Sequence, residues 1–198
     1  MKPFLVRQAL FNRFLLQGKK VFTLLDFSRV FPQSKEQIQY FLETQIQDGF
    51  LIRLKRGVYA LKTDPPSDEE VANALYQPSY ISFEYAMARY GIIPESPYNI
   101  TSATTQPTRI FTTNNIAYTY NTIKSAAYTG YSLDTAGNRR VLIAEPEKAL
   151  VDFLYYIALG QRFWNDRFYT SKLDKNKLKE YAKLFAREKV LELVEKLS

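Results

Sequence analysis

A pair of prolines divides this sequence into two parts of different character. Pro65 and Pro66 cannot lie inside a helix or a central strand, and turn-forming Asp and Ser residues flank them. Ser67 and Glu70 have the spacing of a capping box, in which the two side chains satisfy free amides at a helix start. The pattern predicts a linker at 62–67, a helix at 68–76, and two domains, residues 1–63 and 68–198.

The excess positive charge of the chain lies entirely before this linker. Residues 1–63 carry 11 Lys and Arg against 4 Asp and Glu, a net charge of +7, whereas residues 64–198 carry 16 against 16. Basic charge confined to one segment is typical of a module that binds a polyanion. We therefore expect a nucleic-acid-binding module joined to an electrically balanced body.

Two missing residue types exclude several classes of catalytic site. The chain has no Cys, which excludes thiolate nucleophiles and cysteine-ligated metals, and no His, which excludes imidazole acid–base catalysis. A faint similarity to metal-dependent nucleases, in Asp134, Glu145, Glu147 and Lys148, fails on spacing, because Pro146 stands two residues before the lysine. We expect no catalytic residues, no metal site and no cofactor, and hence a protein that is not an enzyme.

The first 63 residues have the pattern of a winged helix-turn-helix. Apolar pairs at helical spacing predict a helix at 4–17, followed by a short strand at 21–25 and a small helix at 26–30 that ends before Phe31-Pro32. A second capping box, Ser34 with Gln37, opens a helix at 34–47 whose apolar residues face inward.

The start of this second helix is the predicted DNA-reading end. The N-terminus of a recognition helix touches base edges, and its free amides and dipole favour a phosphate. The exposed polar residues expected there are Gln33, Ser34, Lys35, Gln37 and Tyr40.

A basic hairpin is predicted directly after this helix. Residues 50–61 alternate imperfectly between apolar and polar side chains, and Gly57 supplies a turn position. Arg53, Lys55 and Arg56 at its tip are suited to lie along a DNA backbone or in a minor groove. The alternative is an edge strand kept soluble by its charge.

The second part of the chain has an α+β pattern with a helical end. A capped helix is predicted at 78–91 and a buried helix from Glu145, where Pro146 occupies the first turn. Tyr118 and Tyr120, with Tyr128 and Tyr131 further on, could stack single-stranded RNA bases, but period-2 spacing favours packing on a sheet. Strands are predicted at 98–105, 109–113, 116–123 and 140–144, a turn at 136–138, and two amphipathic helices spanning Leu178–Phe185 and Val190–Leu197.

Five short segments, in order along nearly the whole chain, carry a family resemblance. The runs Ser-Tyr-Ile-Ser and Pro-Glu-Lys-Ala-Leu are the most specific parts of it. The segments are Arg53–Tyr59, Ser79–Ala86, Tyr90–Pro94, Thr101–Thr105 and Ala144–Asp152. In these segments the chain closely resembles the AbiEi antitoxins of type IV toxin–antitoxin (abortive infection) systems.

The resemblance implies both a fold and a function. Its N-terminal winged helix would bind inverted repeats in duplex DNA at its own promoter and repress the operon. Its C-terminal domain would counteract a nucleotidyltransferase-type toxin without a stable complex. On this chain the DNA role maps to the helix from Ser34 and the wing at 53–56, and the antitoxic role to 78–198. Candidate exposed residues for the antitoxic role are Arg109, Glu145, Glu147 and Lys148.

The sequence leaves one alternative function open, and it also predicts where in the cell the protein is found. The alternative is a stand-alone winged-helix regulator whose C-terminal half senses a ligand or dimerises. Arg7, Asn12 and Arg13 interrupt any signal-peptide core, and no apolar run approaches the length of a membrane helix. We expect a cytoplasmic protein with an α+β fold and no membrane partner.

Overall fold

The chain forms two compact units. The computed structural model describes residues 20–30, 32–136 and 139–197. The first unit holds the chain up to Leu75 together with Thr135–Arg140, and the second holds Tyr76–Asp134 and the chain from Val141. The predicted helix at 4–17, Phe31 and two residues of the turn at 136–138 lie outside the described residues. The units divide after Leu75, so the helix after the linker groups with the first unit.

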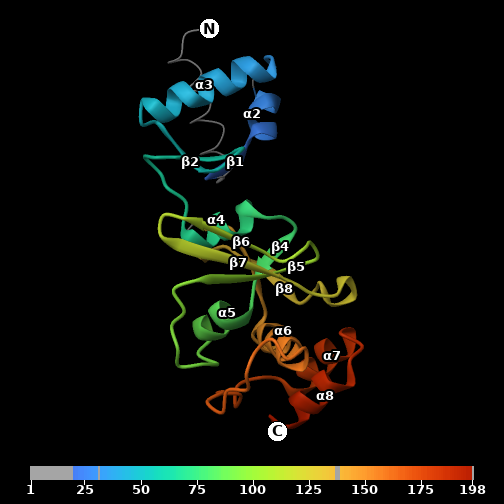
Figure 1. Cartoon of the computed structure of the whole chain (residues 1–198). Helices are drawn as coiled ribbons and strands as arrows, with labels where there is room; N and C mark the ends of the chain where they lie inside the picture. Colours follow the sequence, from blue (N-terminus) through green and yellow to red (C-terminus); the bar gives the residue numbers. More distant parts are fainter. Residues whose placement is uncertain (1–19, 31, 137–138, 198) are drawn as a thin grey trace. The chain divides into compact units, whose positions relative to one another are not determined.

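The described residues have a mixed α+β fold, as expected, with seven α-helices and two sheets. The first unit contains a three-stranded antiparallel sheet with the order β1-β3-β2. Figure 1 shows two helices of this unit, α2 and α3, next to β1 and β2. Its elements are β1 (Val21–Thr23), α2 (Leu24–Val30), α3 (Lys35–Gln47), β2 (Leu51–Lys55), β3 (Val58–Leu61) and α4 (Asp68–Leu75).

An aromatic core holds the first unit together. The ring of Phe27 meets the rings of Phe22 and Tyr59 edge to face, with centroids 5.7 and 6.0 Å apart. Such pairs add about 0.5–1.5 kcal/mol each beyond the burial of their area. Ile38 and Leu42 of α3 are buried in the same cluster, as their helical spacing predicted. The core thereby fixes α3 on the sheet.

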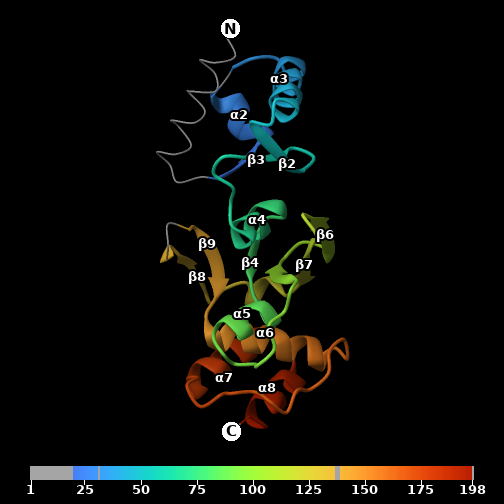
Figure 2. The same cartoon turned by 90° about the vertical axis from the view of Figure 1, so that its left-hand side faces the viewer.

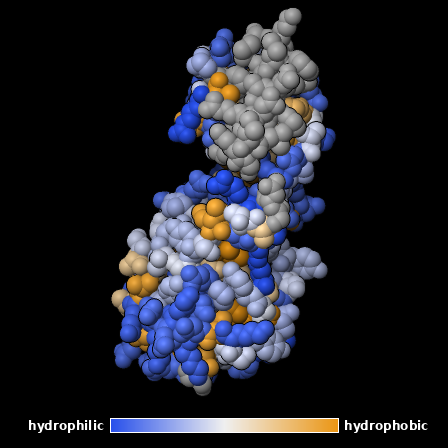
Figure 3. Space-filling view, turned by 180° about the vertical axis from the view of Figure 1, so that it is seen from behind, coloured by the Kyte–Doolittle hydropathy of each residue, from blue (hydrophilic) through white to orange (hydrophobic). Residues whose placement is uncertain are grey.

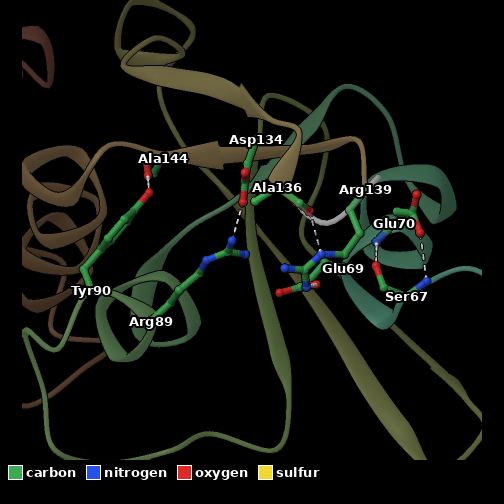
Figure 4. Close-up of polar contacts among 9 residues, drawn as sticks. All are labelled: Ser67, Glu69, Glu70, Arg89, Tyr90, Asp134, Ala136, Arg139 and Ala144. Carbon is green, nitrogen blue, oxygen red and sulfur yellow. Dashed lines mark hydrogen bonds and ion pairs between the residues drawn. The ribbon is translucent and has the colours of Figure 1, made fainter. Parts of the chain in front are cut away.

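The linker and the start of α4 agree with the sequence. Residues 62–67 form neither helix nor strand. The backbone N–H of Ser67 donates to Glu70 Oε2 at 2.9 Å, and the N–H of Glu70 donates to Ser67 Oγ at 3.3 Å. In the same unit, Arg139 donates to Glu69 Oε2 at 2.9 Å and to the carbonyl of Ala136 at 3.2 Å (Figure 4). The predicted capping box of Ser67 and Glu70 at the start of α4 is therefore confirmed.

The second unit is built on a mixed six-stranded sheet with the order β6-β7-β5-β4-β9-β8. The pairs β4–β9 and β5–β7 are parallel, and the other neighbouring pairs are antiparallel. The strands are β4 (Ser79–Ile81), β5 (Ile100–Thr104), β6 (Arg109–Thr113), β7 (Ile116–Thr122), β8 (Tyr131–Asp134) and β9 (Val141–Ala144).

Helices cover one side of this sheet. Figure 2 shows α5 and α6 next to the strands, and α7 and α8 packed beyond them. Helix α6 is buried along most of its length, and its buried residues include the charged Glu147, Lys148 and Asp152 beside a run of apolar side chains. The helices are α5 (Phe83–Arg89), α6 (Pro146–Ala158), α7 (Lys175–Leu184) and α8 (Glu188–Glu195), with a short 3₁₀ turn at Ser125–Ala127. In the described ranges, no helix has both the length and the apolar character needed to cross a membrane.

The predicted helix at 78–91 is wrong in its first turn. Ser79–Ile81 form a strand in the middle of the sheet, and the helix begins only at Phe83. Tyr80 and Ile81 are fully buried because β4 has neighbours on both sides. The sequence reading also missed β8, whose Tyr131 packs against Tyr80 with centroids 4.5 Å apart.

Contacts at the outer end of the sheet join β8 and β9 to α5. Arg89 forms an ion pair with Asp134 at the end of β8. The hydroxyl of Tyr90 donates to the carbonyl of Ala144 in β9 at 2.9 Å (Figure 4). Arg89 thus holds the end of β8, the strand that the sequence did not predict, and Tyr90 holds the end of β9.

Candidate functional site

Helix α3 begins where the sequence predicts. The N–H of Gln37 donates to Ser34 Oγ, and the N–H of Ser34 donates to Gln37 Oε1, both at 3.3 Å. These reciprocal bonds satisfy two amides that the helix itself leaves free. The N-terminus of α3 is thus a stable helix start with a defined geometry.

Polar residues at this helix start are exposed. Gln33, Ser34, Lys35 and Gln37 lie at the surface, and Tyr40 in the next turn is 75% exposed. Their exposure follows from the burial of Ile38 and Leu42, which turns the opposite side of the helix to solvent. All five predicted residues are accessible to a ligand.

An acidic residue shares this helix end. The backbone N–H of Glu36 and the hydroxyl of Ser34 lower the pKa of Glu36, which therefore keeps its negative charge. A carboxylate in the first turn stabilises a helix through its dipole. Glu36 therefore places a negative charge among the exposed polar residues of this helix start.

The hairpin supplies two exposed cations, where the sequence predicted three. Arg53 and Arg56 are exposed, whereas Lys55 is half-buried and its Nζ donates to the carbonyl of Leu75. The tip turns at Gly57, whose φ of +81° is one that glycine adopts without strain. Lys55 satisfies the C-terminal end of α4, so it is less accessible than the two arginines predicted with it to contact DNA.

A shallow hollow lies beside Arg53. It has a volume of about 310 Å³ and is lined by Glu43, Ile46 and Gln47 of α3 and by Arg53 of β2. The guanidinium of Arg53 stands 6.0 Å from the centre of the Tyr59 ring, within cation–π range. The ring fixes the cation at the surface between α3 and the hairpin.

The four candidate antitoxic residues do not form one site. Arg109 is exposed on β6, with its guanidinium 5.9 Å from the centre of the Tyr76 ring. Glu145 is half-buried, whereas Glu147 and Lys148 are buried. The expectation of four exposed residues is therefore wrong for the last two.

Lys148 lies in a buried polar cluster. It forms an ion pair with Asp152, one turn further along α6, and both side chains have no exposed surface. Asp152 Oδ2 also accepts from the hydroxyls of Tyr80, at 3.0 Å, and Ser82, at 2.7 Å. Burial lowers the pKa of Lys148 and raises the pKa of Asp152. The cluster ties α6 to β4 and has no access to solvent.

Glu145 and Glu147 fasten helix α7 to the start of α6. Glu147 Oε1 accepts the backbone N–H of Asp174 at 3.0 Å. Glu145 Oε2 accepts from Lys177 Nζ at 2.9 Å and from the Tyr181 hydroxyl at 3.0 Å. Both glutamates thus have a structural role that the sequence reading missed.

Acid should weaken the attachment of α7. Donation from Lys177 and Tyr181 lowers the pKa of Glu145 below 4.5 in the folded protein. Because a lowered carboxyl pKa stabilises the fold above the unfolded value, this contribution is lost as the pH falls through the folded pKa. In urea titrations from pH 7 to pH 3, the stability advantage of the native chain over Glu145→Gln should shrink towards zero. An advantage that does not change with pH would contradict this.

The tyrosines pack inside the second unit. Tyr118 and Tyr120 have 1% and 0% of their surface exposed, so the packing alternative is confirmed and base stacking by these rings is excluded. Tyr128 and Tyr131 are half-buried and both pack against Tyr80.

The nuclease-like residues serve structural contacts. Asp134 forms an ion pair with Arg89 (Figure 4), and Glu145 is held by Lys177. Among the described residues, no three acidic side chains are grouped in a way that could hold a metal ion.

Comparison with known proteins identifies no relative of this chain. No protein-family model matches the sequence, and no curated protein matches it.

Proposed function

We propose that this chain is a DNA-binding repressor whose first unit acts as a winged helix-turn-helix. The observation that carries the proposal is the capped and exposed start of α3, in the same compact unit as a hairpin with two exposed arginines. In this proposal α3 enters the major groove and the β2–β3 hairpin is the wing.

The chemistry of these residues suits duplex DNA. A free side-chain amide such as that of Gln33 can pair with adenine in two hydrogen bonds, which reads sequence. The amide oxygen of Gln37 is held in the capping box, which leaves its NH₂ group to donate. Lys35 and the guanidinium groups of Arg53 and Arg56 neutralise phosphates, which fixes the register on the duplex without reading it. The net charge of +7 before the linker supplies long-range attraction.

The resemblance to AbiEi antitoxins extends the proposal to the second unit. In this extension the chain represses its own operon by binding inverted repeats and counteracts a nucleotidyltransferase-type toxin in the cytoplasm without a stable complex. Of the four candidate residues, Arg109 is the exposed one and is our first choice for the antitoxic role. The alternative, a stand-alone regulator, needs no toxin.

One co-expression experiment with two readouts tests both parts. Cells carry the chain, its promoter fused to a reporter, and the nucleotidyltransferase-type reading frame from the same operon under separate control. The native chain should repress the reporter and restore growth when the toxin is induced. The double variant Arg53→Ala/Arg56→Ala should lose repression and keep the growth rescue, because the second unit is unchanged.

The other outcomes are equally informative. Repression without growth rescue, or an operon with no such reading frame, would overturn the antitoxic part and leave the regulator. Rescue without repression by the native chain would overturn the DNA-binding part. Arg109→Ala should impair rescue, with Arg167→Ala, an exposed arginine of the same unit, as the matched control.

A further inference from the structure

Strand β6 is an open edge of the six-stranded sheet. Within the described residues it pairs with β7 on one side, and its other side has no neighbouring strand. Ile110, in the middle of β6, is 65% exposed, and Thr112 is also exposed. Figure 3 shows hydrophobic residues on one face of the second unit only as scattered patches.

The turn after β6 determines which backbone groups face outward. Asn114 and Asn115 have φ values of 52° and 61°, the pattern of a two-residue type I′ hairpin. Such a turn makes Thr113 and Ile116 a hydrogen-bonded pair, and the pairs then alternate along the ladder. The N–H and C=O groups of Ile110 and Thr112 therefore point away from β7.

This edge has little of the usual protection against strand pairing. Natural edges are blunted by charged side chains, proline, bulges or a covering element. The segment Arg-Ile-Phe-Thr-Thr has one charged side chain, Arg109, at its first position and no proline, and its β6–β7 register is regular over five pairs. The opposite edge, β8, ends in Asp134, which is ion-paired to Arg89. The outer edge of β6 is thus the better template for a further strand.

We propose that a second copy of this chain pairs with β6 in antiparallel orientation, with Ile110 opposite Ile110 of the second copy. Each of these two residues then donates its N–H to the carbonyl of the other, and Thr108 faces Thr112 at both ends. The two sheets join into one continuous sheet about a two-fold axis, which makes the same patch serve both copies.

Side chains support this occupant and this register. The two Ile110 side chains cover each other on one face. On the other face Arg109 lies opposite Phe111 of the second copy, where a cation can meet an aromatic ring. In this register no residue faces a residue of the same charge across the two strands. A pairing of so few residues gives a small interface, so we expect weak association that strengthens on DNA with two half-sites.

Variants that introduce a charge at Ile110 test the proposal. The full chain is studied by sedimentation over a range of concentrations. The native chain should show a reversible monomer–dimer equilibrium. Ile110→Lys and Ile110→Glu should each weaken it about tenfold or more, because like charges then face each other. An equimolar mixture of the two variants should restore the dimer, a result that a purely structural role of Ile110 cannot produce.

The overturning results are a native chain that stays monomeric at its highest soluble concentration, or a mixture that does not associate. Thr112→Pro provides a second variant, because it removes an outward-facing donor and leaves the bonds to β7 intact. It should weaken the dimer and leave the unfolding transition unchanged. The expected tighter dimerisation on DNA rests on the proposed function, but dimerisation through β6 in the absence of DNA does not. Ile110→Lys should bind a single half-site like the native chain, so loss of the dimer and loss of DNA binding are separable.

Discussion

Replacing Asp152 with asparagine should lower the free energy of unfolding by about 3–5 kcal/mol, because the change leaves the buried ammonium of Lys148 without a counter-ion. Both side chains have no exposed surface, so water cannot replace the lost charge. The amide keeps the shape of the carboxylate and can still accept hydrogen bonds from Tyr80 and Ser82. Urea unfolding at pH 7 measures the loss.

The pH dependence identifies Lys148 as the cause. In the native chain burial already lowers the pKa of Lys148 below its ordinary 10.5, and removing Asp152 should lower it further. The unfolded variant then binds more protons than the folded one, so its stability rises with pH up to about 10.5. The deficit of Asp152→Asn should therefore be largest near neutral pH and shrink in alkali.

Two controls separate the buried charge from other effects. The double variant Lys148→Met/Asp152→Asn should be more stable than Asp152→Asn alone, because it removes the uncompensated charge. Lys189→Met breaks the exposed pair with Glu192, 3.0 Å apart, and should change stability very little. Equal losses in the double and single variants would contradict a charge-based explanation.

The Arg53→Ala/Arg56→Ala variant should bind the upstream DNA of its own operon roughly 30-fold more weakly at 0.15 M salt. Each arginine that leaves a phosphate should also reduce the slope of log affinity against log salt by about 1. Electrophoretic mobility shifts at several salt concentrations give both quantities. Both side chains are exposed, so the variant should fold normally.

Neighbouring residues supply matched controls. Lys55→Ala removes the same charge from the same hairpin, but Lys55 donates to the carbonyl of Leu75, so the salt slope should stay almost unchanged. Gln33→Ala should instead reduce the preference for the operator over unrelated DNA by about 1–3 kcal/mol, with the slope preserved. A Lys55→Ala variant that matches the arginine variant would contradict the assignment of the wing cations.

Local signals predicted the helix starts well. The capping boxes at Ser34 and Ser67 involve residues three apart, so the sequence contains everything needed to recognise them. Helix α6 was recognised from Pro146 and its apolar run. The strand Ser79–Ile81 was missed because three residues carry little periodicity, and its burial depends on β5 and β9, which are distant in sequence.

The roles of charged residues were harder to predict. Glu145 and Glu147 have the composition of a solvated helix start, yet their partners come from α7 and its N-cap, about 30 residues later. Lys148 pairs with Asp152 of its own helix, and Asp152 in turn accepts from Tyr80, a strand residue 72 positions earlier. The i,i+4 spacing of Lys148 and Asp152 was a visible signal of a pair, but not of its burial. Lys55 likewise has the spacing of a wing cation, while its acceptor lies 20 residues away.

The segment Thr135–Arg140 belongs to the first unit although it lies within the sequence of the second, and this limits how the protein can be divided into fragments. A polypeptide that stops at Leu75 contains Glu69 and lacks Arg139, its partner at 2.9 Å. The complementary piece from Tyr76 keeps that arginine and loses the helix to which it binds. A cut after Leu75 therefore separates Glu69 from Arg139, so neither piece contains a complete unit.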